Sequence, residues 1–345
     1  MAKDNENVPS LNDGPIQDSP ARSFAADQMV RCESCLRANP PSRVNCLYCG
    51  SALPLAPSAI VSQKPTRRPL EKWEQGYNNI LLPSAANLSE NCLTETAALL
   101  RLESEDLKRI LASDLPLPLA RSSSKQEAEL IQQRLEGAQL ATLIVADSSF
   151  GLDPPLKLRA LEFHDDGLDA YQSPQSPPMK ITWTEFVLIV SGRITRKRVE
   201  LKEERKRSEN RVLEADQFFA DELVIDLYTK RTTNPYRITS GSFDFSCLAD
   251  KKQLVAAANL SILIDVFREH VPGIVYDQTY NSVRKVLEPV WRSEQQKEST
   301  GWRRGRPGKY SIGSATETSN ESQFLRYSRL RNYLLTQNQM GNADG

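Results

Sequence analysis

Four cysteines near the N-terminus, arranged as two Cys-x2-Cys pairs, are the feature that most constrains how this chain can fold. Ten residues separate the two pairs, whose members are Cys32, Cys35, Cys46 and Cys49. Tetrahedral zinc takes thiolate ligands at about 2.3 Å, and each Cys-x2-Cys turn supplies two of them. The segment between the pairs has too few apolar residues to fold unaided, so a metal would have to supply the folding energy, on the order of 10 kcal/mol. The spacing therefore predicts a structural zinc ion (Zn2+) rather than redox-active thiols, which normally occur as a single pair beside a βαβ unit.

The residues around these cysteines resemble known zinc-binding modules. Asn45–Gly50, with Asn39 four residues after Cys35, is similar to the short zinc ribbons of many bacterial regulatory and adaptor proteins. The spacing also fits the Ran-binding-protein-type zinc finger, a family that binds RNA or ubiquitin. That family has a tryptophan two residues before its first cysteine, where this chain has Val30, so its base-stacking role is not carried over. The resemblance implies a zinc ribbon over residues 29–52.

Composition indicates more than one folded part. The chain has 345 residues, which is long enough for several cores, and its hydrophobic content of 39% is low for one compact globule. Nine of the 21 prolines fall within the first 75 residues. We therefore expect residues 1–28 to be disordered and residues 53–75 to form a proline-rich linker. The chain has 44 basic and 44 acidic residues, so any attraction to phosphate must be local.

Residues 76–150 are predicted to form a small α/β domain. Apolar spacing and turn residues predict, in order, a strand at 77–82, helices at 90–100 and 104–112, an edge strand at 115–119, a helix that begins at a Ser123/Gln126 capping box and ends at Gly137, and a strand at 140–146.

This order resembles the C-terminal domain of the bacterial ribosomal stalk protein. The match covers about 46 of the 345 residues and is best at Ser124, Lys125, Glu127, Ala128, Leu135, Glu136, Gly137 and Ala138. The family has a turn rich in glycine and lysine between its first two helices, which faces translation factors. Arg101–Ser104 occupies that place here. The resemblance therefore implies the fold but not the factor-binding role.

From residue 155 to residue 291 the pattern changes to β. Strands are expected at 156–163, 168–171, 180–183, 186–194, 222–228, 236–239 and 243–248, followed by a long apolar helix at about 252–269 and a second one near 280–290. Strands closed by one helix resemble a pleckstrin-homology-like antiparallel barrel, on topology alone. Residues 292–345 are expected to be a polar, loose tail with a short amphipathic helix at 323–335. The fold class is therefore multi-domain α+β.

The strongest local charge lies at Arg193–Arg211, which has nine basic and four acidic residues. We expect this stretch to project as an exposed hairpin or loop. It is either a solvated surface or a site for a phosphate-bearing partner, such as nucleic acid or an anionic membrane. A second basic spot follows Trp302. The candidate anion-binding residues are Arg196, Lys197, Arg198, Arg205, Lys206, Arg207, Arg303, Arg304 and Arg306.

No combination of residues typical of catalysis accompanies these features. Only two histidines occur, His164 in a predicted turn and His270 at a helix end. Cys92 and Cys247 are isolated and read as small apolar groups. We therefore expect a non-enzymatic, cytoplasmic protein without a membrane span that binds zinc and acts as an adaptor for a protein partner. The alternative is a ribosome- or RNA-associated factor that uses the segments 193–211 and 302–306.

Overall fold

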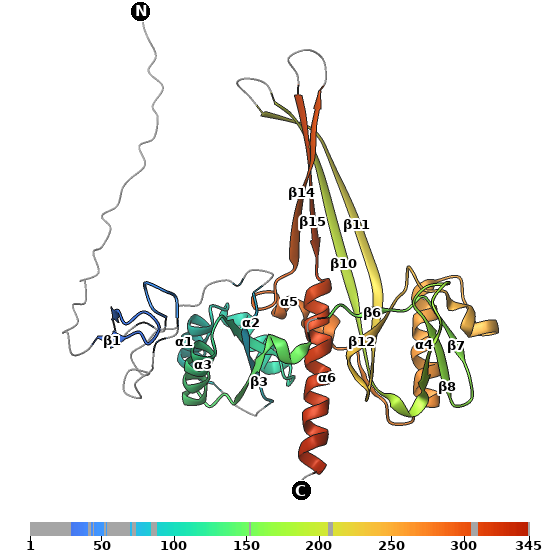
Figure 1. Cartoon of the computed structure of the whole chain (residues 1–345), viewed down its shortest axis with the longest axis horizontal. Coiled ribbons are helices and arrows are strands. Elements are labelled where there is room, and N and C mark those ends of the chain that lie inside the picture. The colour runs from blue at the N-terminus through green and yellow to red at the C-terminus, as the bar shows by residue number, and fades with distance from the viewer. Residues whose placement is uncertain are drawn as a thin grey trace, which may run out of the picture. The chain divides into compact units, whose positions relative to one another are not determined.

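The computed structural model describes residues 29–40, 43, 45–51, 53, 70, 74–83, 88–151, 153–205, 210–304 and 310–343. The chain divides into two compact units, Met1–Thr66 and Arg67–Gly345. Figure 1 shows a mixed α/β protein with several separate sheets. The expected disordered segment 1–28 and most of the expected linker 53–75 lie outside the described residues. No helix among those described is long and apolar enough to cross a membrane.

The first unit contains one small hairpin. Strand β1 (Val30–Arg31) pairs antiparallel with β2 (Ala38–Asn39), and the cysteine turns follow these strands. Its buried apolar cluster consists of Cys32, Cys46 and Leu53. Because Leu53 is the one aliphatic member of this cluster, hydrophobic burial contributes little to the stability of the described part of the unit.

The second unit begins with the predicted α/β segment, and its order of elements is confirmed. Strand β3 (Tyr77–Leu81) is central in a three-stranded antiparallel sheet, between β4 (Pro118–Ser122) and β5 (Thr142–Ala146). The helices are α1 (Glu90–Leu100), α2 (Ser104–Ala112) and α3 (Lys125–Gly137). Strand β4 lies later than the predicted 115–119, and its edge position agrees with Pro118, its first residue. The N-cap of α3 is Ser124, which accepts from the backbone N–H of Glu127, and not the predicted Ser123.

A seven-stranded sheet forms the centre of the second unit and curls into a half-barrel. Two long strands, β10 (Phe186–Arg205) and β11 (Asn210–Thr229), pair antiparallel along their length. They are followed on one side by β12 (Thr232–Thr239) and β6 (Leu156–Lys157), and on the other by β15 (Tyr310–Ser319) and β14 (Glu294–Arg304). Strand β13 (Val275–Asp277) pairs with β10. The β6–β12 and β10–β13 pairs are parallel, so the sheet is not the purely antiparallel barrel that was expected.

A second three-stranded sheet and a helix pack with one face of the central sheet to form a second core. The strands are β7 (Ala160–Phe163), β8 (Gly167–Tyr171) and β9 (Met179–Thr182), and the helix is α4 (Ala256–His270). The expected strand at 243–248 is instead a 3-10 helix, Phe245–Lys251, which buries Phe245 and Leu248. Helix α4 begins later than predicted, after the exposed residues Leu254 and Val255.

The C-terminal segment 292–345 is not the loose tail that was expected. It supplies β14, β15 and the long helix α6 (Glu321–Ala343), which follows α5 (Tyr280–Leu287). Helix α6 buries Phe324, Tyr327 and Leu330. The sequence of β14 and β15 is almost entirely polar, because strands that pair beside β10 need few apolar residues of their own. Their polar composition therefore predicted a loose tail.

One hydrophobic core joins segments that were expected to belong to different domains. The same cluster contains Ile80 and Leu107 from the α/β segment, Val190 from β10 and Phe324 from α6. Polar contacts strengthen this connection, since the indole N–H of Trp291 donates to Asn78 Oδ1 at 2.9 Å. The expected boundary between residues 150 and 155 therefore does not separate two hydrophobic cores.

Candidate functional site

The two Cys-x2-Cys turns of the first unit have the same backbone design. In the first, the N–H of Leu36 donates to the carbonyl of Cys32, and the N–H of Cys32 donates to the carbonyl of Arg37. In the second, the N–H of Gly50 donates to the carbonyl of Cys46, and the N–H of Cys46 donates to the carbonyl of Ser51. Leu36 and Gly50 both adopt left-handed backbone angles, with φ of 59° and 74°. Each turn thus directs its two thiols to the same side of the turn.

The two turns bring the four sulfur atoms together. The Sγ atoms of Cys32 and Cys49 are 3.5 Å apart, as are those of Cys35 and Cys46. All four sulfurs lie within 4.8 Å of one another. Four thiolates around one tetrahedral zinc ion would be about 3.8 Å apart. The described geometry therefore fits a single metal ion held by Cys32, Cys35, Cys46 and Cys49.

Hydrogen-bond donors around Cys46 favour its thiolate form. Burial opposes ionisation of this thiol, but N–H donors from Tyr48, Cys49 and Asn39 outweigh it and lower the pKa of Cys46 to about 6. Asn39 also accepts from the backbone N–H of Leu47 through its Oδ1 atom, at 2.8 Å, which fixes the amide. The contact of Asn39 with Cys46 forms only in the folded turn, so the sequence indicates Asn39 through a resemblance alone.

The outer surface of the turns carries exposed apolar side chains. The exposed fractions of Leu36, Leu47 and Tyr48 are 63%, 51% and 56%. The guanidinium of Arg37 lies 4.7 Å from the centroid of the Tyr48 ring. We call Leu36, Leu47 and Tyr48 the knuckle surface. Apolar groups gathered on so small a unit are typical of a contact surface.

In its described part, the basic segment Arg193–Arg211 belongs to the strands of a long hairpin, one of the two expected alternatives, and is not a free loop. Its first thirteen residues belong to β10, which is paired with β11 on one side and from Arg196 onward with β15 on the other. Arg196 and Arg198 point to the same face of this ribbon and form ion pairs there, Arg196 with Glu321 at 2.8 Å and Arg198 with Glu200 at 2.7 Å. Lys197 points to the opposite face, because successive strand residues alternate.

The remaining candidate anion-binding residues are only partly described. Lys206, Arg207 and Arg306 lie outside the described residues. For Arg205, Arg303 and Arg304 the structure describes the backbone, which places them at the ends of β10 and β14. The described side chains thus do not bring the predicted basic residues together on one surface.

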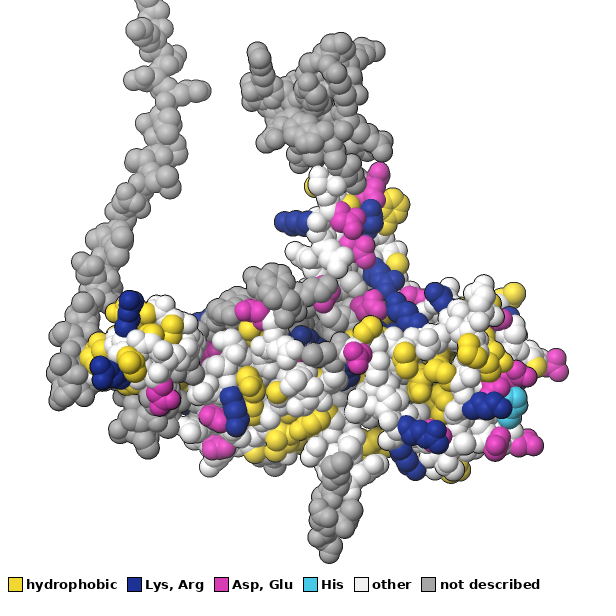
Figure 2. Space-filling model, viewed as in Figure 1, with side chains coloured by type: hydrophobic (Ala, Val, Ile, Leu, Met, Phe, Trp, Pro, Cys, Tyr) yellow, Lys and Arg dark blue, Asp and Glu magenta, His cyan; other side chains and the backbone are white. Residues whose placement is uncertain are grey.

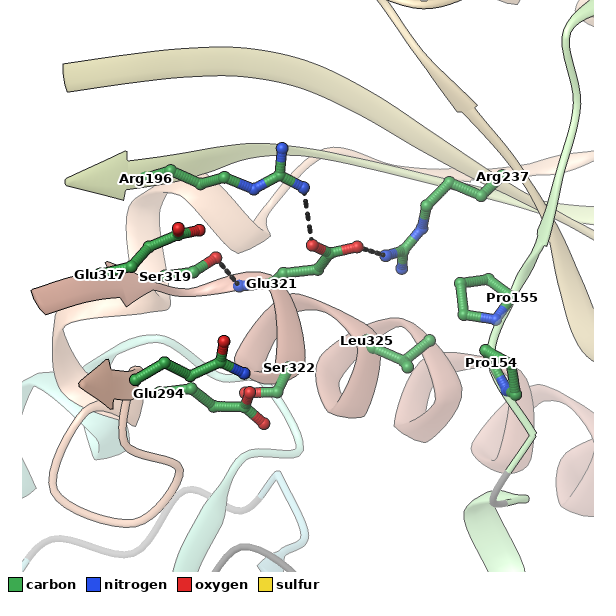
Figure 3. A pocket seen from close by; sticks show the side chains of 11 residues that line it. Pro154, Pro155, Arg196, Arg237, Glu294, Glu317, Ser319, Glu321, Ser322 and Leu325 are labelled. Carbon is green, nitrogen blue, oxygen red and sulfur yellow. Dashed lines mark hydrogen bonds and ion pairs between the residues drawn. The ribbon is translucent and has the colours of Figure 1, made fainter. Parts of the chain in front are cut away.

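A charged pocket of about 430 Å³ lies where the ribbon meets α6 (Figure 3). Its floor includes Arg237, which is fully buried and forms a two-pronged ion pair with the buried Asp226 at 2.7 and 2.8 Å. Glu321 accepts from both Arg237 and Arg196 (Figure 3). Burial alone would raise the pKa of Glu321, but hydrogen bonding from Arg196 and the charge of Arg237 lower it below its ordinary value. Both arginines are therefore committed to carboxylates of the protein, and the pocket is not built for anions.

The histidines and the isolated cysteines occupy ordinary structural places. His270 stacks on Trp183, with ring centroids 4.3 Å apart. His164 lies in the β7–β8 turn, where its Nε2 atom is 3.4 Å from Asp169 Oδ2. Its ligand atoms and those of Glu162 and Asp169 lie within 4.8 Å of one another at the surface, close enough to share a metal ion. Burial raises the pKa of the Cys247 thiol to about 11, which disfavours a reactive thiolate.

Comparison with known proteins finds no family model, curated protein or solved structure that matches this chain.

Proposed function

We propose that Cys32, Cys35, Cys46 and Cys49 bind one structural zinc ion, and that the chain is a non-catalytic cytoplasmic adaptor. The observation that carries the zinc assignment is the convergence of four thiols from two turns of identical design. Thiolates are soft ligands that favour zinc, and a closed set of four leaves no open position for catalysis. Unpaired thiols in this arrangement suit a reducing compartment.

Elemental analysis of protein purified without added metal tests this assignment. We expect one zinc per chain, and we expect Cys46→Ser to lose most of it, because three thiolates bind zinc less tightly than four. Cys92→Ser is the matched control, since Cys92 lies on α1 and should leave the zinc content unchanged. Full zinc content in Cys46→Ser, or a different metal in the native protein, would contradict the assignment.

The adaptor role rests on the knuckle surface. Zinc supplies the folding energy that hydrophobic burial cannot, so Leu36, Leu47 and Tyr48 are left free for a partner instead of being used for a core. This differs from a nucleic-acid site, where basic side chains dominate the contact. A protein partner with an apolar contact surface fits these residues best.

Capture experiments with the tagged full chain distinguish the two functional classes. Leu47→Ser combined with Tyr48→Ser should abolish capture of the partner while zinc content stays at one per chain. Leu254→Ser removes an even more exposed apolar group from the second unit and should have no effect. Capture that survives the double substitution contradicts the adaptor surface, and capture lost on nuclease treatment favours the RNA-associated alternative.

A further inference from the structure

The ribbon formed by β14, β15, β10 and β11 sorts its side chains into two faces of opposite charge. Residues directly opposite each other in paired strands share a face, so the strand register assigns every side chain. On one face, three successive rows run across the ribbon. They are Glu294–Ser319–Arg196–Ala220, Gln296–Glu317–Arg198–Phe218 and Glu298–Ala315–Glu200–Asp216. We call this the acidic face.

The acidic face has five carboxylates and two guanidiniums, and its net charge is −3. The opposite face has the rows Gln295–Thr318–Lys197–Phe219, Lys297–Thr316–Val199–Gln217 and Ser299–Ser314–Leu201–Ala215, and within these three rows the net charge is +2 and there is no carboxylate. Basic and acidic side chains are visible on the described part of the ribbon in Figure 2. Such sorting is not required for folding, because both faces are exposed to solvent.

The acidic face also holds a cavity and an exposed aromatic ring. Glu294, Gln296 and Glu317 belong to its rows and line the pocket described above. Phe218, in the middle row, is 57% exposed. Glu317 Oε2 lies 3.9 Å from Arg198, which also contacts Glu200, so one guanidinium serves these two carboxylates.

We propose that the acidic face is a docking site for a basic segment of a protein partner. A lysine or arginine side chain of that segment enters the pocket beside Glu294 and Glu317, and an apolar neighbour covers Phe218. Charge complementarity selects this occupant, since the carboxylates repel nucleic acid and anionic membranes. The surface belongs to the second unit and is separate from the knuckle surface, so this inference goes beyond the proposed function.

A second copy of the chain is a poorer occupant. The basic face of one copy would meet the acidic face of another, and the same contact would repeat from copy to copy. Such a head-to-tail contact closes into a ring only for particular rotations and otherwise forms filaments.

The test uses the full chain with a synthetic peptide of alternating lysine and valine, and the matching glutamate–valine peptide as a control. The lysine peptide should bind, and amides of β10, β14 and β15 should exchange more slowly when it is present. Glu298→Gln combined with Asp216→Asn should weaken binding by about tenfold, because two of the carboxylates that attract the lysine side chains are lost.

The matched control carries the same change in net charge on the other face of the ribbon. Gln295→Lys combined with Gln217→Lys should leave the affinity for the lysine peptide within about twofold of the native protein. Leu47→Ser with Tyr48→Ser should also leave it unchanged, which separates this inference from the adaptor proposal. Equal losses in the two charge variants, equal binding of both peptides, or absence of amide protection would overturn it. So would concentration-dependent self-association that Glu298→Gln abolishes.

Discussion

Asp147 shows how single buried charges hold the second unit together. Its carboxylate accepts from the backbone N–H of Gly76 at 2.8 Å, from Asn78 at 2.9 Å and from Arg326 of α6 at 2.7 Å. Arg121 completes the set. Burial raises the pKa of Asp147, but Arg326 and Arg121 outweigh it, so the net shift is downward. One carboxylate therefore ties the α/β segment to the C-terminal helix.

Replacing Asp147 should make stability less dependent on pH. Because the folded-state pKa lies below the unfolded value, the carboxylate stabilises the fold fully above the unfolded pKa and loses that contribution as pH falls through the folded pKa. Asp147→Asn should cost about 3 kcal/mol at neutral pH, since it leaves the partly buried Arg121 and Arg326 without their charged partner. Urea denaturation across acidic and neutral pH should show the gap between native and variant protein closing in acid. A gap that stays constant with pH would contradict this role.

At the scale of the element, two glycines differ in whether their surroundings leave room for a side chain. Gly167 begins β8, and a Cβ there would lie 2.8 Å from the Cα of Thr182 and clash with the carbonyl of Ile181 in β9. Gly167 is not among the glycines with positive φ, so the close approach of the β9 backbone is what requires glycine here. Gly137, at the end of α3, has open space around it.

These two positions should respond to alanine with opposite signs. Gly167→Ala should destabilise the protein by about 2 kcal/mol, because backbone atoms cannot move aside as a flexible side chain can. Gly137→Ala should be neutral or stabilise by up to about 1 kcal/mol, from improved helix propensity. Thermal unfolding of both variants checks this, and a loss of stability in Gly137→Ala as large as that in Gly167→Ala would count against it.

At the scale of the whole molecule, the division of the chain differs from the one that the sequence pattern indicates. The described residues form two units, and the second joins the α/β segment, the curled sheet and the C-terminal helix through one core. Long-range contacts such as that of Trp291 with Asn78 close this core. The unit should therefore unfold as one cooperative body.

Limited proteolysis of the native protein tests this division. We expect cleavage within the proline-rich stretch at 53–75, followed by a resistant fragment that starts near residue 74 and extends into α6. No early cleavage should occur between residues 150 and 155, because Gly151 and Asp153 both accept hydrogen bonds from Arg329. Early release of a stable 76–150 fragment would show that the α/β segment is an independent domain after all.

The sequence by itself determined what depends on neighbours along the chain. The cysteine pairs predict their own cluster because each turn is built from consecutive residues, and α1 and α2 have the predicted bounds because apolar spacing and capping are local. The edge position of β4 follows likewise from Pro118 at its start.

Only the tertiary structure decided which segments share a sheet and a core. The sequence pattern groups Arg196, Lys197 and Arg198 as neighbouring candidate anion-binding residues. In the structure, pairing of β10 with β15 and β11 places Lys197 on one face and both arginines on the other, where they form ion pairs. The polar strands β14 and β15 pair with each other, but β15 joins the sheet through β10, which is far away in the sequence, so their polar sequences carry no local signal of that pairing. Register between distant strands is set by the packing of the whole unit, so no local pattern in the sequence could have revealed the sorting of charge across the ribbon.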